Sequence, residues 1–116
     1  MRCLYKLLSR AQWEEFRKLG TFCGADIDLK DGFIHFSYAD QVKETAERHF
    51  SGMDDLVLIA VDAARVAPAL RDEVSRHGML FPHLYGPLSI ADVVWDSVLE
   101  RRADGSLVFP PLDQRF

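Results

Sequence analysis

The chain has 116 residues, 48% hydrophobic and 28% charged, with a formal net charge of −4, a composition that predicts one folded domain over residues 1–116. The acidic balance and the absence of a Lys and Arg cluster argue against a nucleic-acid partner. Because no segment has the apolar length of a membrane span or the pattern of a signal peptide, we expect a cytoplasmic protein with no membrane partner, and the sequence carries no signal of oligomeric state.

The first quarter of the chain predicts a strand, a helix and a loop. Residues 3–8 are rich in strand formers, and residues 10–19 have helical periodicity. Ser9, with Gln12 three residues later, has the spacing of a capping box at the start of that helix. Residues 21–32 contain three aspartates and end in an Asp-Gly pair, so they predict a loop with a tight turn.

The middle of the chain continues the alternation of strands and helices. Residues 33–37 predict a short buried strand, and residues 39–50 predict an amphipathic helix. The apolar run at residues 56–61 lies between aspartates and predicts a central strand that is buried on both faces. A short helical turn before Pro68 and a strand over residues 69–74 follow.

The last third of the chain is mostly strand-like. Residues 82–85 lie in a run with two prolines and a glycine, which favours a short edge strand or an ordered loop. One helical turn follows at residues 90–93. Strand-like runs at residues 93–102 and 106–110 flank a turn at Gly105 and indicate a hairpin. This order of elements favours an α+β domain over a doubly wound parallel one.

The two cysteines, Cys3 and Cys23, have no CxxC spacing and no histidine at a zinc-ligand separation. Both are therefore predicted to be reduced and largely buried thiols.

The stretch "DGFIHFS", residues 31–37, places polar groups inside an apolar strand. Side chains two residues apart share one face of a strand, so Phe33, His35 and Ser37 are predicted to point the same way, with the histidine and the serine about 7 Å apart. An imidazole and a hydroxyl at that spacing suit a small ligand. The alternative is a core histidine bonded to a backbone carbonyl, with Ser37 capping the next helix.

The stretch "FPHLYGPL", residues 81–88, repeats the pattern. In an extended segment His83 and Tyr85 share a face, and Gly86 permits the close approach of a ligand or of another backbone. The alternative is a core aromatic residue followed by a turn.

Three further sets of residues have more than one possible role. On a strand over residues 69–74, Arg71 and Glu73 share a face and would hold a phosphate and a ribose hydroxyl, or form a solvated edge. His49 and His77 are interpreted as structural or exposed. A metal site would need Asp31, His35 and His83 together, although their spacing is not typical of metal ligands, and no metal is predicted.

The stretches "DGFIHFS", "ADQVKETAERHF", "DDLVLIAVD" and "FPHLYGPL" resemble the bacterial domain of unknown function family 952 over most of the chain. At fold level that family is similar to the ADP-ribosyltransferase-like group. The resemblance implies a split, mostly antiparallel β-sheet core with two flanking helices around a cleft that holds NAD.

In the ADP-ribosyltransferase-like group, a histidine on an early strand bonds the ribose, a tyrosine stacks on nicotinamide, and a late glutamate stabilises the charge that develops on the sugar. In many members that histidine is followed two residues later by serine or threonine, and His35 and Ser37 are similar to this pair. Tyr85 is the candidate tyrosine, and Glu73 or Glu100 is the candidate glutamate.

The function expected from this resemblance is the binding of NAD or an ADP-ribose-like nucleotide, with or without glycosyl transfer. His35 and Glu73 are the candidate catalytic residues, and the candidate ligand-binding residues are Ser37, His83, Tyr85 and Arg71. The alternative is a non-catalytic small-molecule binding or protein-interaction domain with structural histidines.

Overall fold

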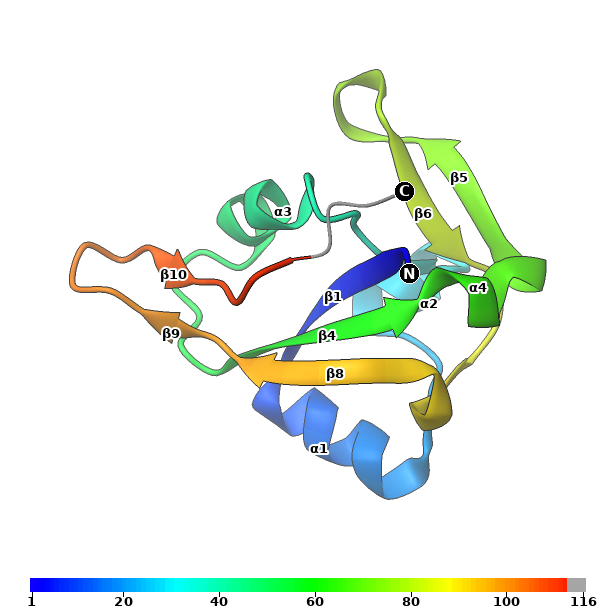
Figure 1. The fold of residues 1–116 in the computed structure, drawn as a ribbon, viewed down its shortest axis with the longest axis horizontal. Coiled ribbons are helices and arrows are strands. Elements are labelled where there is room, and N and C mark those ends of the chain that lie inside the picture. Colours follow the sequence, from blue (N-terminus) through cyan, green and yellow to red (C-terminus); the bar gives the residue numbers. More distant parts are fainter. Residues whose placement is uncertain (113–116) are drawn as a thin grey trace.

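The centre of the fold is a three-stranded antiparallel sheet in the order β1-β4-β8 (Figure 1). Its strands are β1 (Cys3–Ser9), β4 (Leu56–Asp62) and β8 (Val93–Val98). The computed structural model describes residues 1–112. The middle strand is β4, and residues 56–61 within it are all buried, which confirms the predicted central strand.

Each face of β1 and β4 packs against its own apolar cluster, as the alternation of side chains along a strand requires. One cluster joins the two strands to helix α1 (Arg10–Leu19) and to a second sheet, and the other joins them to helix α3 (Val42–His49) and the C-terminal segment. Buried members of the first cluster include Leu4, Leu8, Phe16, Ile34, Ile59 and Leu84. Buried members of the second include Tyr5, Leu7, Val42, Ala46, Leu58 and Leu99.

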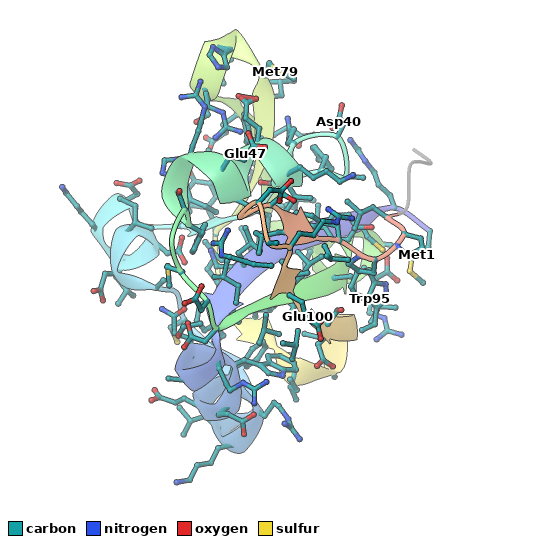
Figure 2. The ribbon with its side chains drawn as sticks, turned by 90° about the vertical axis from the view of Figure 1, so that its left-hand side faces the viewer. Met1, Asp40, Glu47, Met79, Trp95 and Glu100 are labelled. Carbon is teal, nitrogen blue, oxygen red and sulfur yellow. The ribbon has the colours of Figure 1, made fainter. Side chains whose placement is uncertain are left out.

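The two longest helices lie on opposite sides of the central sheet (Figures 1 and 2). Helix α1 (Arg10–Leu19) begins at a capping box between Ser9 and Gln12, as predicted. Helix α3 (Val42–His49) is shorter than the predicted helix, because residues before Val42 form a turn in which Gln41 N donates to Tyr38 O.

A second antiparallel sheet carries both histidine stretches. It has the order β3-β6-β5, formed by β3 (Ile34–His35), β6 (Leu80–Leu84) and β5 (Leu70–Val74). The strand at residues 69–74 is confirmed, whereas the predicted edge position of residues 82–85 is wrong because β6 is the middle strand. Pro82 lies opposite Asp72 of β5, and on the β3 side its carbonyl accepts a hydrogen bond from Phe36 N at 3.0 Å.

The stretch predicted as one strand over residues 33–37 is divided between the two sheets. Only Ile34 and His35 pair with β6. Ser37 pairs with Tyr5 of β1 through two backbone hydrogen bonds of 2.8 and 2.9 Å. This segment therefore links the second sheet to the central sheet.

The predicted loop at residues 21–32 contains a short helix, α2 (Asp26–Asp31), which ends at Gly32 in a left-handed conformation with φ of 87°. The buried residue of this helix is Asp28, while Ile27 and Leu29 are exposed. Because the helix buries a carboxylate instead of an apolar stripe, its sequence lacks the amphipathic pattern. The prediction for Cys23 is also wrong, because its side chain is exposed, whereas Cys3 is buried as expected.

The remaining elements are short. They are β2 (Thr21–Phe22) paired with β7 (Leu88–Ser89), β9 (Glu100–Arg101) paired with β10 (Leu107–Val108), helix α4 (Ala63–Val66), and single 3-10 turns at Ala67–Ala69, Arg76–Gly78 and Ile90–Asp92. The C-terminal hairpin is confirmed, although its strands are only two residues long. The fold is therefore α+β, with antiparallel strand pairing throughout residues 1–112. Within those residues, no helix is long and apolar enough to cross a membrane.

Candidate functional site

The two histidine stretches meet on one face of the second sheet. His35 on β3 and His83 on β6 are directly opposite each other in the strand register, and their ring centroids are 5.3 Å apart. Phe33 stacks on His83, with the centroids 4.1 Å apart and the rings 8° from parallel. Two segments almost fifty residues apart in sequence thus form one surface, which we call the histidine face (Phe33, His35, Glu73, His83, Tyr85).

A buried aspartate of α2 holds the ring of His35. Oδ1 of Asp28 lies 2.7 Å from Nδ1 of His35 and accepts the backbone N–H of His35 at 3.0 Å. Its other oxygen accepts the backbone N–H of Ala25 at 2.8 Å. Burial alone would raise the pKa of Asp28, but the hydrogen bonds from His35, the charge of Lys6 and the N–H of Ala25 lower it to about 2. Asp28 is therefore an ionised acceptor, and Nδ1 of His35 is the donor.

Lys6 of β1 contacts both Asp28 and the backbone of His35. Its ammonium lies 3.1 Å from Oδ2 of Asp28, with 9% of the lysine side chain and none of the aspartate side chain exposed. The ammonium also donates to the backbone carbonyl of His35 at 2.8 Å. A buried charge needs a partner, and this ion pair provides one for each residue while fixing the backbone of β3.

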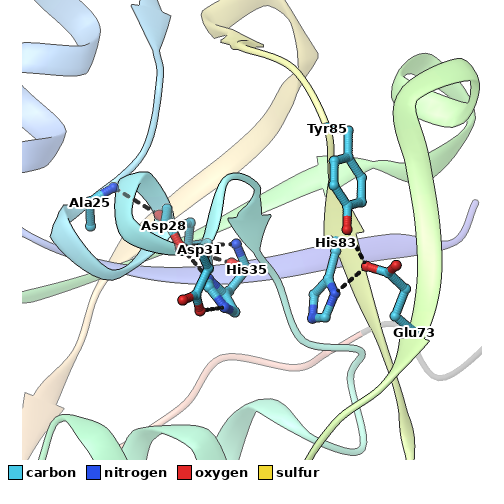
Figure 3. A network of polar contacts seen from close by, with 8 residues as sticks. Ala25, Asp28, Asp31, His35, Glu73, His83 and Tyr85 are labelled. Carbon is cyan, nitrogen blue, oxygen red and sulfur yellow. Dashed lines mark hydrogen bonds and ion pairs between the residues drawn. The ribbon is translucent and has the colours of Figure 1, made fainter.

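A second carboxylate organises the other histidine, as Figure 3 shows beside the first group. Oε1 of Glu73 lies 2.8 Å from Nδ1 of His83 and accepts the hydroxyl of Tyr85 at 2.7 Å. Both hydrogen bonds lower the pKa of Glu73, and the bond with His83 has the larger effect. The same carboxylate raises the pKa of Tyr85. Among residues 1–112, Nε2 of His83 has no hydrogen-bond partner.

The outer nitrogen of His35 faces an exposed carboxylate. Nε2 of His35 lies 3.0 Å from Oδ2 of Asp31, at the end of α2. About 31% of the histidine side chain and 38% of the aspartate side chain are exposed. A small molecule can therefore reach this contact from solvent.

Two of the predicted ligand-binding residues make no hydrogen bond or ion pair with the residues of the histidine face. Arg71 is directly opposite His83 in the register, is exposed, and makes no hydrogen bond or ion pair with the described residues. Ser37 is buried, and its hydroxyl bonds Thr45 of α3 at 2.9 Å. Ser37 does not cap α3, because Gln41 occupies the N-cap position.

The metal site considered for Asp31, His35 and His83 is not formed. In the described part of the chain, no group of three or more histidine, cysteine, aspartate or glutamate residues is placed to hold a metal ion. The reason is that Asp31 contacts His35 directly, while His83 is bonded to Glu73. His77 and His49 are exposed, and His77 contacts Arg48 on α3.

The sequence pattern does not reveal the roles of three residues of the network. Asp28 lies in the predicted loop, Lys6 has no predicted role, and Phe33 is predicted only to share a strand face with His35. A lysine inside an otherwise buried strand is a detectable signal, because such a residue needs a buried partner. The partner itself, Asp28, is 22 residues away and has no local pattern that would reveal it.

A cavity of about 320 Å³ opens next to this network, between α2 and the connection from β6 to β7. Asp28 and Phe33 belong both to its wall and to the surroundings of the histidines. The other lining residues are mostly apolar: Cys23, Leu29, Gly32, Ile34, Leu84, Gly86 and Pro87. Its volume is at the lower end of the range found for small-molecule sites.

The fold and the network define a small α+β protein with two histidines, each held by a carboxylate, on one sheet face. The model of the family described as "Protein of unknown function (DUF952)" matches residues 7–96, and the chain belongs to this family. None of the curated proteins matches the chain significantly.

Solved structures of one bacterial protein are similar over almost the whole chain. The crystal structure of protein CC0527 from Caulobacter crescentus is 44% identical, with 91% of this chain and 93% of that chain covered and a TM-score of 0.87. The solution NMR structure of CC0527 is 45% identical, with 90% of each chain covered and a TM-score of 0.81. This likeness supports the α+β fold described above.

Proposed function

We propose that the histidine face binds a ribose-containing nucleotide, NAD or an ADP-ribose-like molecule. The observation that carries the proposal is the juxtaposition of His35 and His83, each with Nδ1 held by a carboxylate and Nε2 directed away from it. A carboxylate on one ring nitrogen fixes the tautomer and orientation of the imidazole, which leaves the other nitrogen for a ligand.

Each part of the face suits one part of such a ligand. Arg71, which makes no hydrogen bond or ion pair with the described residues and whose charge acts on Glu73, supplies a guanidinium for a phosphate. Tyr85, with 46% of its surface exposed, supplies an aromatic ring beside Phe33. His35 is directed to the ribose hydroxyls. Ser37 contributes indirectly through Thr45, which positions the start of α3 next to the sheet.

The choice of ligand rests on the sequence resemblance described above, which implies a likeness to the ADP-ribosyltransferase-like group and its NAD-binding split sheet. Glycosyl transfer in that group needs a glutamate near the scissile bond. Glu73 is the candidate, because it shares the histidine face with His83, while Glu100 lies on β9 in the C-terminal hairpin. Only one oxygen of Glu73 is used by His83 and Tyr85, so the other remains for the sugar.

The competing function is an interaction or binding domain in which the histidines organise the fold. The burial of His83, whose side chain is 6% exposed, favours that alternative for this residue. His35 separates the two functions, since about 31% of its side chain is exposed and the proposed function predicts that its loss abolishes nucleotide binding.

The test is a thermal-shift measurement with ADP-ribose and NAD on the wild type, His35→Ala and His49→Ala. Ligand at 100 times its dissociation constant adds about 2.7 kcal/mol of stability, which corresponds to a rise of roughly 10 °C in Tm for a chain of this size. We expect this rise in the wild type and in His49→Ala, which changes an exposed histidine of α3. We expect no rise in His35→Ala. An equal rise in all three proteins, or none in any, would refute the proposal.

A further inference from the structure

Helix α2 directs two carboxylates, three residues apart, to the two nitrogens of a single imidazole. Asp28 contacts Nδ1 of His35 at 2.7 Å, and Asp31 contacts Nε2 at 3.0 Å. The two aspartates differ in their exposure to solvent. Asp28 is fully buried, whereas 38% of the Asp31 side chain is exposed. One helix therefore provides one fixed support and one accessible neighbour for the same ring.

Asp28 is the fixed support. It accepts the backbone N–H groups of Ala25 and His35 and the ammonium of Lys6 in addition to the ring. These donors fix the orientation of the carboxylate of Asp28. Because the carboxylate is an acceptor, its contact with the ring requires a proton on Nδ1 of His35. The orientation of Nε2 is thereby determined before any ligand arrives.

Asp31 is the accessible neighbour. Its contact with Nε2 is its only hydrogen bond or ion pair with the described residues. It is the last residue of α2, next to Gly32. Its side chain can therefore move away from the ring without breaking another interaction. With the proton of His35 on Nδ1, Nε2 and the carboxylate of Asp31 are two acceptors 3.0 Å apart, an arrangement that a hydrogen-bond donor from a ligand stabilises.

We propose that Asp31 and Nε2 of His35 together form a binding site for a sugar hydroxyl, with Asp31 as a ligand-binding residue and Asp28 as the positioning residue. With the proton of His35 on Nδ1, Nε2 and Asp31 are both acceptors, so a hydroxyl that lies between them donates its hydrogen to one of the two. A vicinal diol satisfies the same pair with one hydroxyl on each group. An ionised phosphate group has no donor for either acceptor. This inference rests on the proposed function and identifies the part of the ligand that His35 recognises.

The surroundings of the pair agree with a neutral polar ligand group. The charged and titratable side chains around His35 are Asp28, Asp31, Lys6 and His83. Lys6 is already paired with Asp28 on the buried side of the ring. On the accessible side, Asp31 presents negative charge, which disfavours a phosphate on Nε2 and favours a hydroxyl donor.

The test compares the dissociation constants of ADP-ribose and of ADP, which lacks the second ribose, by calorimetry. We use the wild type, Asp31→Ala, Asp31→Asn and Asp26→Ala. Asp26 is the matched control because it is an exposed aspartate on the same helix that has no contact with His35. We expect the wild type and Asp26→Ala to bind ADP-ribose at least about tenfold more tightly than ADP, as hydrogen bonds to a charged group predict.

In Asp31→Ala we expect this preference to disappear while ADP still binds. Asp31→Asn keeps an oxygen that accepts from the hydroxyl and should retain part of the preference. A tenfold preference that persists in Asp31→Ala overturns the inference, as does a wild type that binds ADP and ADP-ribose equally. A wild type that binds neither nucleotide overturns the proposed function itself, so the two failures are distinguishable.

The role of Asp28 is tested without any ligand. Nitrogen-15 NMR of the imidazole of His35 reports which ring nitrogen carries a proton. We expect Nδ1 to be protonated in the wild type and in Asp31→Ala. A ring protonated only on Nε2 in either protein would show that Asp28 does not set the tautomer.

Discussion

The substitution Lys6→Met tests whether the buried ion pair holds the histidine face in place. At 3.1 Å and an effective dielectric constant of about 20, the attraction between Lys6 and Asp28 is about 5 kcal/mol. Relief from the burial of the ammonium offsets part of this loss, and Asp28 keeps its backbone donors. We therefore expect a decrease of about 3 kcal/mol in the free energy of unfolding, the lower end of the range for broken buried pairs.

The measurement is urea denaturation at pH 7, accompanied by the shift in Tm, which should fall by roughly 10 °C. Lys18→Met is the matched control, because Lys18 is exposed on α1 and makes no hydrogen bond or ion pair with the described residues. The control should change stability by less than about 0.5 kcal/mol. A loss below about 1 kcal/mol in Lys6→Met would refute the reasoning, because Asp28 would then be satisfied without its lysine.

Three further predictions concern single groups. The pKa of Asp28 is lowered from 3.8 to about 2. Its ionisation therefore adds about 2 kcal/mol to the free energy of unfolding above pH 3.8, and this contribution is lost as the pH falls through 2. In acid denaturation, the stability difference between the wild type and Asp28→Asn should shrink over that pH window. Burial and the hydrogen bond to Asp72 raise the pKa of Tyr38 to about 12, so an ultraviolet titration should show one phenol ionising near that pH, and Tyr38→Phe should remove this step. Gly32→Ala should cost about 1 kcal/mol in thermal unfolding because φ is 87°, whereas Gly86→Ala, whose Cβ would lie 3.7 Å from Ala69, should be nearly neutral.

The sequence pattern predicts those elements that bury an apolar face. Residues 56–61 form a continuous apolar run, and the capping box at Ser9 marks the start of α1, so both elements are predicted correctly. Helix α2 is missed because it buries Asp28, and no apolar periodicity reports such a helix. The middle position of β6 is not predicted, because a proline such as Pro82 normally indicates an edge strand.

The sequence predicts which strand faces carry the polar residues, but it does not predict which of their side chains bond one another. The alternation along each strand correctly places His83 beside Tyr85, and the sharing of a face by Arg71 and Glu73 follows from β5. The carboxylate that supports each ring cannot be predicted, because the partners are separated in sequence and meet only through the register of β3, β5 and β6. Ser37 shows the opposite limit, since the chain leaves the sheet after His35 and directs its hydroxyl to Thr45.

The most direct test of the histidine face is an NMR titration that follows the imidazole signals of all four histidines as ADP-ribose is added. If the face binds the nucleotide, the signals of His35 and His83 move together and saturate at one dissociation constant, while those of His49 and His77 stay in place. Movement of His77 alone, or of no histidine although the ligand binds, would contradict the account and place the ligand elsewhere on the chain.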